Sequence, residues 1–302
     1  MNAAWAPPLT CCRCGASHRR RGLGGQDSAA GASLRSRDGL PVQVMAVADG
    51  HGSARHPRSQ VGSRLACAAA LELVEGAIAA SCLDDDGPWA RRRWRRWLAG
   101  DLPAAIHAAW LTAVEADWRR HGAGDAEPFS PVPYGSTLAV VVMTPCWWGY
   151  TGLGDWDLVV VEGQGRARLA SEESGVDPHG GERTLSLCLE TAPTLFASRS
   201  RLHALPRLAA GEPLALVLST DGIRKSCVTD ADFLRLCSWM AASATTATQA
   251  SAADQRGQEA SGMELSEALD RISSQGSGDD VTVAVGLLQG RTMGRSATAA
   301  RP

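Results

Sequence analysis

The stretch that decides the fold is residues 42–52, which read VQVMAVADGHG. Its first seven residues, Val42–Ala48, are rich in β-branched and other apolar side chains and predict a buried strand. The strand ends at Asp49, and Gly50 and Gly52 follow where the backbone turns. A carboxylate placed directly after a buried strand lies at the edge of a sheet, where a ligand can reach it.

The same arrangement recurs twice further along the chain. A second apolar strand, Leu214–Ser219, is followed by Asp221 and a glycine. Asp279 and Asp280 come after a glycine-rich turn and directly before the strand Val281–Leu288. A single Asp-Gly pair is usually only a turn. Three acidic sites placed alike predict carboxylates that converge at one edge of a sheet. Their mutual repulsion calls for a cation, and ligation by oxygen alone favours Mg²⁺ or Mn²⁺ over zinc.

The rest of the chain predicts an α+β fold with antiparallel sheet inside and helices outside. Residues 57–80 have apolar side chains at i+4 spacing, and Thr229 with Asp232 forms an N-terminal capping pattern. The predicted helices are 57–80, 91–120 with a break at 100–103, 229–240 and 263–274. The further predicted strands are 136–143, 147–152, 157–162 and 166–170.

Composition excludes several classes of protein. The chain has 302 residues, 44% apolar and 21% charged, with a net charge of -2, so neither a wholly disordered chain nor a nucleic-acid coat is expected. The charge-free stretch 128–154 is interrupted by prolines and predicts a β-hairpin rather than a membrane span. The start of the chain has no signal-peptide pattern. Nine cysteines, mostly within apolar runs, predict free thiols and a cytoplasmic location.

Two residue clusters could have either a functional or a purely structural role. Cys11, Cys12 and Cys14 could hold a metal, but no second ligand pair at matching spacing follows, so an incidental group is expected. The segment 91–97, RRRWRRW, could bind nucleic acid or a membrane. A helix with a solvated arginine face and two half-buried tryptophans fits the overall charge balance better. We therefore expect neither a nucleic-acid nor a membrane partner.

Three segments are expected to lie outside the packed core. Residues 1–14 are predicted to be an N-terminal extension. Residues 241–262 are dominated by Ala, Ser, Thr and Gln, which can bury little surface, so a flexible insertion is expected there. Residues 289–302 are expected to form a disordered tail.

Five short motifs occur in an order that identifies a family. They are Ala48-Asp49-Gly50-His51-Gly52, Tyr134–Thr137, Gly152–Asp155, Ser219–Gly222 and Gly278–Thr282. With them, the chain resembles the PPM-type (type 2C) metal-dependent protein serine/threonine phosphatases over residues 15–288. Residues 15–18 and 26–27 are similar to the opening of bacterial members. The resemblance implies one phosphatase domain, 15–288, folded as a four-layer α-β-β-α sandwich with central antiparallel sheets.

The resemblance also implies a set of metal ligands. Asp49 would bridge two ions of Mg²⁺ or Mn²⁺, with the Gly50 carbonyl completing one site and Asp27 nearby. Asp221 and Asp279 would hold the other ion. Asp280 stands where the family often has Asn, which favours Asp279 of that pair. Asp155 is a doubtful candidate for a third ion, because Lys225 replaces the family's other acidic ligand there.

The resemblance assigns no protein nucleophile. A water molecule between the two ions would attack phosphorus, and His51 would protonate the leaving oxygen. A structural turn histidine is the alternative for His51. The family's phosphate-binding arginine has its counterpart at Gly22, so Arg21, or Arg19 or Arg20, would have to serve. Gln26 replaces a frequent glutamate.

The function expected is a protein serine/threonine phosphatase that is monomeric and acts on phosphoproteins, opposing a bacterial kinase. Two alternatives remain at this point. One is a catalytically weak regulatory module that binds phosphoproteins, which the departures at Gly22 and Lys225 favour. The other is a hydrolase of small phosphoesters. The retained Asp49, Asp221 and Asp279 favour an active enzyme.

Overall fold

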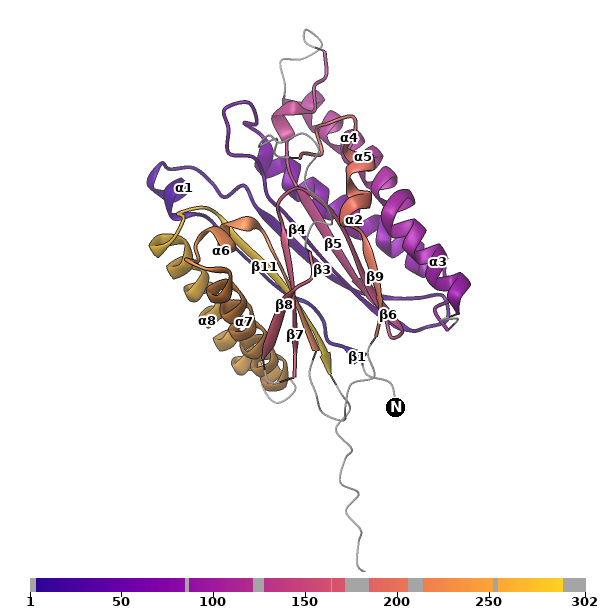
Figure 1. The fold of residues 1–302 in the computed structure, drawn as a ribbon. Coiled ribbons are helices and arrows are strands. Elements are labelled where there is room, and N and C mark those ends of the chain that lie inside the picture. Colours follow the sequence, from indigo (N-terminus) through magenta and orange to yellow (C-terminus); the bar gives the residue numbers. More distant parts are fainter. Residues whose placement is uncertain are drawn as a thin grey trace, which may run out of the picture.

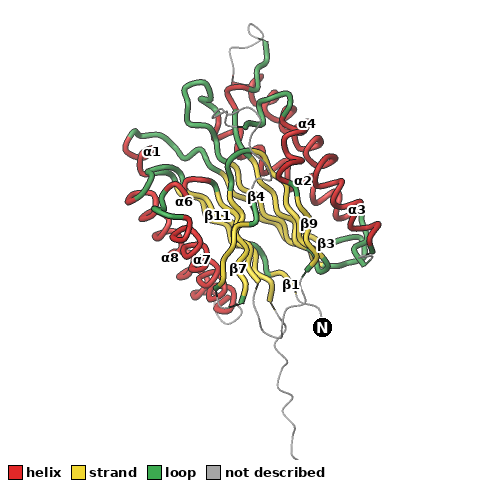
Figure 2. The backbone as a smooth tube through the Cα atoms, in the orientation of Figure 1, coloured by secondary structure: helices red, strands yellow, loops and turns green. Residues whose placement is uncertain are grey.

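The computed structural model describes residues 4–84, 87–121, 128–163, 165–171, 185–205, 214–251 and 255–289. These residues form two antiparallel sheets stacked face to face, with helices on both outer faces (Figure 1). Figure 2 shows the strands as an inner double layer with the helices on either side. The predicted four-layer α-β-β-α sandwich is confirmed.

The first sheet has the strand order β3-β4-β5-β6-β9 in the described part of the chain. Its strands are β3 (Ser28–Arg35), β4 (Pro41–Ala48), β5 (Leu138–Met143), β6 (Trp147–Leu153) and β9 (Arg201–Ala204). The helices on its side are α2 (Ser59–Ala79), α3 (Pro88–Arg96), α4 (Leu102–His121) and α5 (Ala192–Leu195). Short 3-10 helices cover Val132–Tyr134 and Phe196–Arg199.

The second sheet has the order β1-β11-β10-β7-β8, with β2 also paired to β11. Its strands are β1 (Ala4–Trp5), β2 (Leu9–Arg13), β7 (Asp157–Glu162), β8 (Arg166–Leu169), β10 (Leu214–Ser219) and β11 (Val281–Gln289). The helices on its side are α1 (Ala16–Arg20), α6 (Asp221–Lys225), α7 (Asp230–Ser251) and α8 (Gln255–Gln275).

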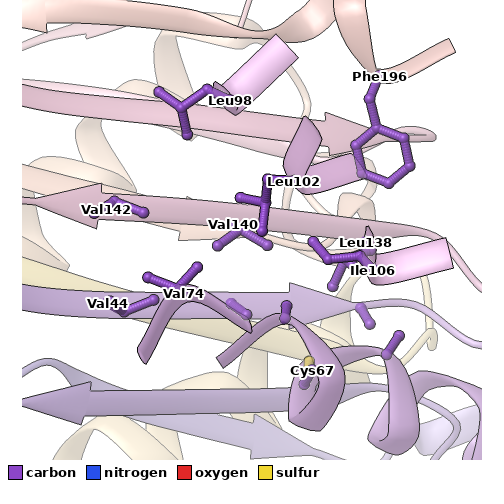
Figure 3. Close-up of a cluster of buried hydrophobic side chains, with 14 of the residues drawn as sticks. Val44, Cys67, Val74, Leu98, Leu102, Ile106, Leu138, Val140, Val142 and Phe196 are labelled. Carbon is purple, nitrogen blue, oxygen red and sulfur yellow. The ribbon is translucent and has the colours of Figure 1, made fainter. Parts of the chain in front are cut away.

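Strand β4 is buried at every residue from Val42 to Ala48 because both of its faces are covered, and Gln43 is its one polar side chain. Val44 and Ala46 belong to the cluster under the helices, whereas Met45 and Val47 belong to the cluster between the sheets. Figure 3 shows the helix side, where Val44 and its strand neighbours lie opposite side chains from α2 and α4. The strand neighbours drawn are Leu138, Val140 and Val142, and the helix residues are Val74, Leu102 and Ile106. Burial of such a strand on both faces fixes its position and therefore that of Asp49 at its end.

The prediction of a flexible insertion at 241–262 is wrong for the residues that the structure describes. Helix α7 continues to Ser251, and α8 begins at Gln255. Ala241, Ala244 and Ala247 are buried at helical spacing, and the first two pack into the core of the second sheet. Small alanine side chains bury little area each, but alanine is the best helix former and lets the helix approach the sheet closely.

Residues 4–13 are part of the sandwich rather than an appended extension. β2 pairs with β11 from Leu9↔Val285 to Arg13↔Val281, and β1 pairs with the other end of β11. The indole Nε1 of Trp5 donates to the carbonyl of Thr144 at 3.0 Å. At the other terminus, Gln289 closes β11, and the rest of the predicted tail lies outside the described residues.

Most of the remaining local predictions agree with the structure. The expected hairpin forms from β5 and β6. The helix break predicted at 100–103 is wrong, because the chain stays helical from Pro88 to His121 and only widens its geometry into a π-helical turn at Trp97–Asp101. The backbone N–H of Asp232 donates to Thr229 Oγ1, which confirms the cap of α7. Trp94 is buried against Trp97 and Trp147, so the tryptophans of segment 91–97 mainly serve packing. None of the described helices combines the length and apolar character that a membrane crossing requires.

Candidate active site

The topology brings the predicted acidic residues to one end of the sandwich. β3 begins after Asp27, and the antiparallel β4 ends before Asp49, with Ser28 paired to Ala48. β6 runs parallel to β4 through β5 between them, so Asp155 follows at the same edge. In the other sheet β10 ends where β11 begins, which places Asp221 beside Asp279. This is the end at which α1 and α6 lie (Figure 1).

Asp49 is fixed by the Tyr134–Thr137 motif. Its backbone N–H donates to Thr137 Oγ1 at 2.9 Å, and its carbonyl accepts from the Thr137 N–H at 2.8 Å and the Ser136 hydroxyl at 2.9 Å. These bonds engage the backbone and leave the carboxylate free to face the other acidic groups. Across the sheets, the Thr220 hydroxyl donates to Asp27 Oδ2 at 2.8 Å and joins the two halves of the site.

Glycines follow two of the acidic residues because the chain is crowded there. A Cβ on Gly50 would lie 2.6 Å from the Gln26 carbonyl oxygen. A Cβ on Gly222 would lie 2.0 Å from the carbonyl oxygen of Asp280. Only glycine permits these approaches, which draw the loops bearing the carboxylates together.

The carboxylates interact strongly with one another. Burial, and then the negative charge of Asp280, raises the pKa of Asp27 to about 7. Burial together with a hydrogen bond to Asp155 and the charge of Asp49 raises the pKa of Asp221 to about 8. The pKa of Asp49 is raised well above its usual range by burial and by the charges of Asp27, Asp279 and Asp155. Like charges gathered in a desolvated site bind protons, or a cation, to relieve their repulsion.

The residues present fit a divalent cation. Asp221 Oδ1 is buried and accepts no hydrogen bond from the described residues. The surrounding donors are carboxylate and carbonyl oxygens, which are the ligands of Mg²⁺ and Mn²⁺. Asp27, Asp49, Asp221 and Asp279 thus lie at the same end of the sandwich and interact through their charges, and their roles as metal ligands stay a prediction. Asp155 joins them from an exposed position on the rim.

Lys225 occupies an unexpected place in this centre. One turn of α6 after Asp221, its Nζ lies 2.6 Å from Asp221 Oδ2 and 3.6 Å from Asp279 Oδ2. Burial alone would lower the pKa of Lys225, but the hydrogen bond to Asp221 and the nearby carboxylates raise it above its usual range. Lys225 therefore carries a positive charge directly beside two of the proposed metal ligands.

Asp280 holds the loop that carries Asp27, a role that sequence reasoning missed. Its Oδ2 accepts the backbone N–H groups of Gln26 and Asp27, and its Oδ1 accepts the Gly15 N–H. The His18 Nδ1 lies 2.9 Å from the same Oδ1. The sequence contained both partners, the motif Gly15–His18 and the acidic residue before β11. Their contact could not be predicted, because the two lie at opposite ends of the sequence.

Cys14, His18 and Asp280 come within 4.8 Å of one another through their potential ligand atoms. These contacts do not make a metal site, because the Asp280 carboxylate already accepts four N–H groups. The Cys14 thiol instead lies near backbone carbonyls. Cys12 is exposed, and its Sγ accepts a hydrogen bond from the Thr282 hydroxyl at 3.0 Å. The three cysteines near the N-terminus are thus free thiols, as expected.

Arg199 supports the Asp155 loop and was also not predicted. Its guanidinium donates to the carbonyls of Gly154, Trp156 and Ser171, and it stacks over the Trp156 ring at 4.2 Å from the centroid. Only 8% of Arg199 is exposed, so this cation is buried among carbonyl oxygens. The Gly152–Asp155 motif therefore has a fixed backbone even though the Asp155 side chain reaches solvent.

His51 lies beside the carboxylates on the turn after β4. Its backbone N–H donates to the Gly135 carbonyl at 3.1 Å, and its ring centroid lies 5.0 Å from that of His56. Burial, and then the nearness of His56, lowers the pKa of His51 to about 4. The imidazole is therefore neutral at neutral pH, and its buried Nε2 has no hydrogen-bond partner among the described residues.

The predicted phosphate-binding arginines lie at the surface, Arg19 and Arg20 on α1 and Arg21 directly after it. Arg21 Nε donates to the Ser17 carbonyl at 3.3 Å, and Arg19 pairs with Asp270 at 3.0 Å. Arg20 donates to the Ser17 hydroxyl. All three side chains are exposed, and none of their described polar partners is a carboxylate of the centre. A role for Arg21 in phosphate binding stays a prediction.

Comparison with known proteins identifies a family and a shared fold. The sequence profile of the family described as protein phosphatase 2C matches residues 14–257. A structure titled "bacterial serine phosphatase" is 13% identical, covers 94% of this chain and 98% of its own, and has a TM-score of 0.52. The serine/threonine phosphatase Stp1 from Staphylococcus aureus is 14% identical, with 94% and 95% covered and a TM-score of 0.51.

A third similar structure is the catalytic domain of the serine/threonine phosphatase PstP, in complex with two manganese ions. It is 18% identical, covers 95% of this chain and 99% of its own, and has a TM-score of 0.49. No curated protein sequence is significantly similar to the chain. At these sequence identities the solved structures show the fold alone. The family profile matches most of the sequence and therefore shows the family. The chain belongs to the protein phosphatase 2C family.

Proposed function

We propose that this chain is a metal-dependent protein serine/threonine phosphatase that hydrolyses phosphoserine or phosphothreonine in proteins phosphorylated by a bacterial kinase. The observation that carries the proposal is the convergence of Asp27, Asp49, Asp221 and Asp279 at one end of the sandwich. Family membership supports the same reaction class.

In this proposal Asp27 and Asp49, together with the Gly50 carbonyl, would hold one ion of Mg²⁺ or Mn²⁺. Asp49, Asp221 and Asp279 would hold a second. When bound, such ions would supply an ionised water as nucleophile and offset negative charge on the phosphoryl oxygens. The carboxylates would hold the ions, and Thr220 and Asp280 keep Asp27 in position for this.

His51 is proposed to act at the leaving oxygen. With its pKa lowered to about 4, it would meet the substrate as a neutral imidazole. A neutral ring can still donate one N–H hydrogen bond to the alkoxide as it forms. Binding of a phosphate dianion beside the ring would also favour its protonated form. Either action would help a serine or threonine leaving group, which is a poor one.

The test is hydrolysis of a panel of phosphothreonine and phosphoserine peptides in Mn²⁺, with p-nitrophenyl phosphate as a small phosphoester and EDTA as the control. The proposal predicts peptide hydrolysis that EDTA abolishes and added Mn²⁺ restores. Hydrolysis of p-nitrophenyl phosphate without any peptide hydrolysis would instead identify a hydrolase of small phosphoesters. Peptide binding without turnover would identify a regulatory module.

A further inference from the structure

Lys225 lies where the proposed centre would bind one of its ions. Its Nζ is 2.6 Å from Asp221 Oδ2 and 3.6 Å from Asp279 Oδ2. A divalent ion ligated by these two residues would contact the same carboxylates at about 2.0–2.2 Å. The ammonium and the ion therefore compete for the same oxygens and repel each other at that distance.

The position of Lys225 follows from the chain itself. Asp221 and Lys225 are the first and last residues of α6, so their side chains lie on the same face of the helix. The lysine side chain is 52% exposed, whereas that of Asp221 is only 10% exposed. The lysine can therefore swing into solvent without leaving a buried gap, while the carboxylate stays in place.

The other half of the centre has no such cation among the described residues. Asp27 receives a hydrogen bond from the Thr220 hydroxyl, and Asp49 is surrounded by other carboxylates. Among the described residues, Lys225 forms ion pairs with Asp221 and Asp279 and with neither Asp27 nor Asp49. The two proposed metal positions thus differ in charge, although both are built from aspartates.

We propose that Lys225 acts as a tethered cation at the Asp221–Asp279 position, so that a divalent ion enters this position only by displacing it. This inference rests on the metal centre of the proposed function. It predicts one ion held firmly at Asp27 and Asp49 and a second held weakly, so that activity depends on the concentration of free metal. In the absence of the second ion, the ammonium keeps Asp221 and Asp279 together.

The test is a Mn²⁺ titration of the chelator-treated full chain, followed by isothermal calorimetry and by the electron paramagnetic resonance signal of free Mn²⁺. Lys225→Gln removes the charge and Lys225→Arg keeps it. Arg224→Gln is the matched control, because its neighbouring guanidinium pairs with Asp157 and Asp230 instead. The inference predicts two unequal Kd values in the parent, in Lys225→Arg and in Arg224→Gln.

In Lys225→Gln the weaker Kd should fall at least about tenfold, because a like charge within about 4 Å is removed, while the tighter Kd changes little. If the parent and Lys225→Gln have the same two Kd values, the inference is overturned. If neither protein binds Mn²⁺, the proposed centre fails as well. Tighter binding without phosphopeptide hydrolysis would uphold the role of Lys225 and contradict the proposed function alone.

Discussion

The Nδ1 atom of His18 lies 2.9 Å from Oδ1 of Asp280, and their side chains are only 9% and 3% exposed. An ionised carboxylate can only accept, so this geometry places the His18 proton on Nδ1. The same carboxylate accepts three backbone N–H groups from residues 15, 26 and 27. The buried Asp280 carboxylate therefore holds the N-terminal loop, which includes Asp27, against the start of β11 through hydrogen bonds.

Asp280→Asn tests the contribution of these hydrogen bonds to stability. One of the carboxylate oxygens becomes an NH₂ group that faces two N–H donors, so at least two charge-assisted hydrogen bonds are lost. The free energy of unfolding should fall by about 3 kcal/mol or more. Urea unfolding measures it. Asp270→Asn is the matched control, because Asp270 pairs with partly exposed Arg13 and Arg19 and should cost at most about 1 kcal/mol. Equal losses would contradict the special role of Asp280.

Helix α7 provides a test of its own packing. Ala244 is 1% exposed in the core of the second sheet, whereas Ala242 is exposed on the same helix. Ala244→Glu buries a charge and should destabilise the fold by about 3 kcal/mol or more. Ala242→Glu should change the stability by less than about 0.5 kcal/mol. If thermal melting shows the two variants to be alike, this part of α7 does not pack as described.

Asp117 predicts a pH dependence of stability. Burial alone would raise the pKa of Asp117, but hydrogen bonds from Tyr134 and Arg58 lower it below the usual value. A depressed folded-state pKa adds stability above the unfolded pKa of about 4, and this stability is lost as the pH falls through the folded value. Asp117→Asn should therefore cost about 1–2 kcal/mol at neutral pH and less near pH 2–3, by urea unfolding. A cost that does not shrink in acid would contradict this sign.

The sequence predicted the strands and the acidic residues because both depend on local pattern. The run Val42–Ala48 is buried on both faces and apolar except at Gln43. Asp49 directly follows that strand and Asp221 comes two residues after β10, so their positions can be read from neighbours in sequence. The pairing of β2 with β11, and of His18 with Asp280, joins residues more than 250 positions apart. No local pattern signals such contacts.

Two other errors have physical causes. Residues 241–251 have few large apolar side chains, and counting those side chains understates a helix that packs through Ala241 and Ala244. The contact of Lys225 with Asp279 depends on where α6 places the side chain relative to β11. From the sequence, Lys225 marked a missing acidic ligand and a positive charge available to the phosphate, whereas the structure pairs its ammonium with Asp221 and Asp279.

His51→Gln distinguishes a role at the leaving group from support of the loop. A threonine alkoxide needs a hydrogen-bond donor or a proton, whereas p-nitrophenolate leaves readily without one. The substitution should therefore slow phosphothreonine-peptide hydrolysis at least about tenfold more than p-nitrophenyl phosphate hydrolysis. Mn²⁺ affinity should change little. Equal losses on both substrates, together with weaker Mn²⁺ binding, would make His51 a support of the Asp49 turn.

The most direct test of the central claim, that a metal held by Asp49 carries phosphopeptide hydrolysis, is the Mn²⁺-dependent rate of Asp49→Asn. The rate should fall by at least about a hundredfold, the scale expected when charge stabilisation by metal is lost. In EDTA the Asp49→Asn variant should melt at a temperature no lower than the parent, because one of the repelling carboxylates has been removed. As a matched control, Asp101→Asn changes an exposed aspartate and should keep the parental rate. A rate for folded Asp49→Asn within a fewfold of the parent, or parental hydrolysis that persists in EDTA, would contradict the claim.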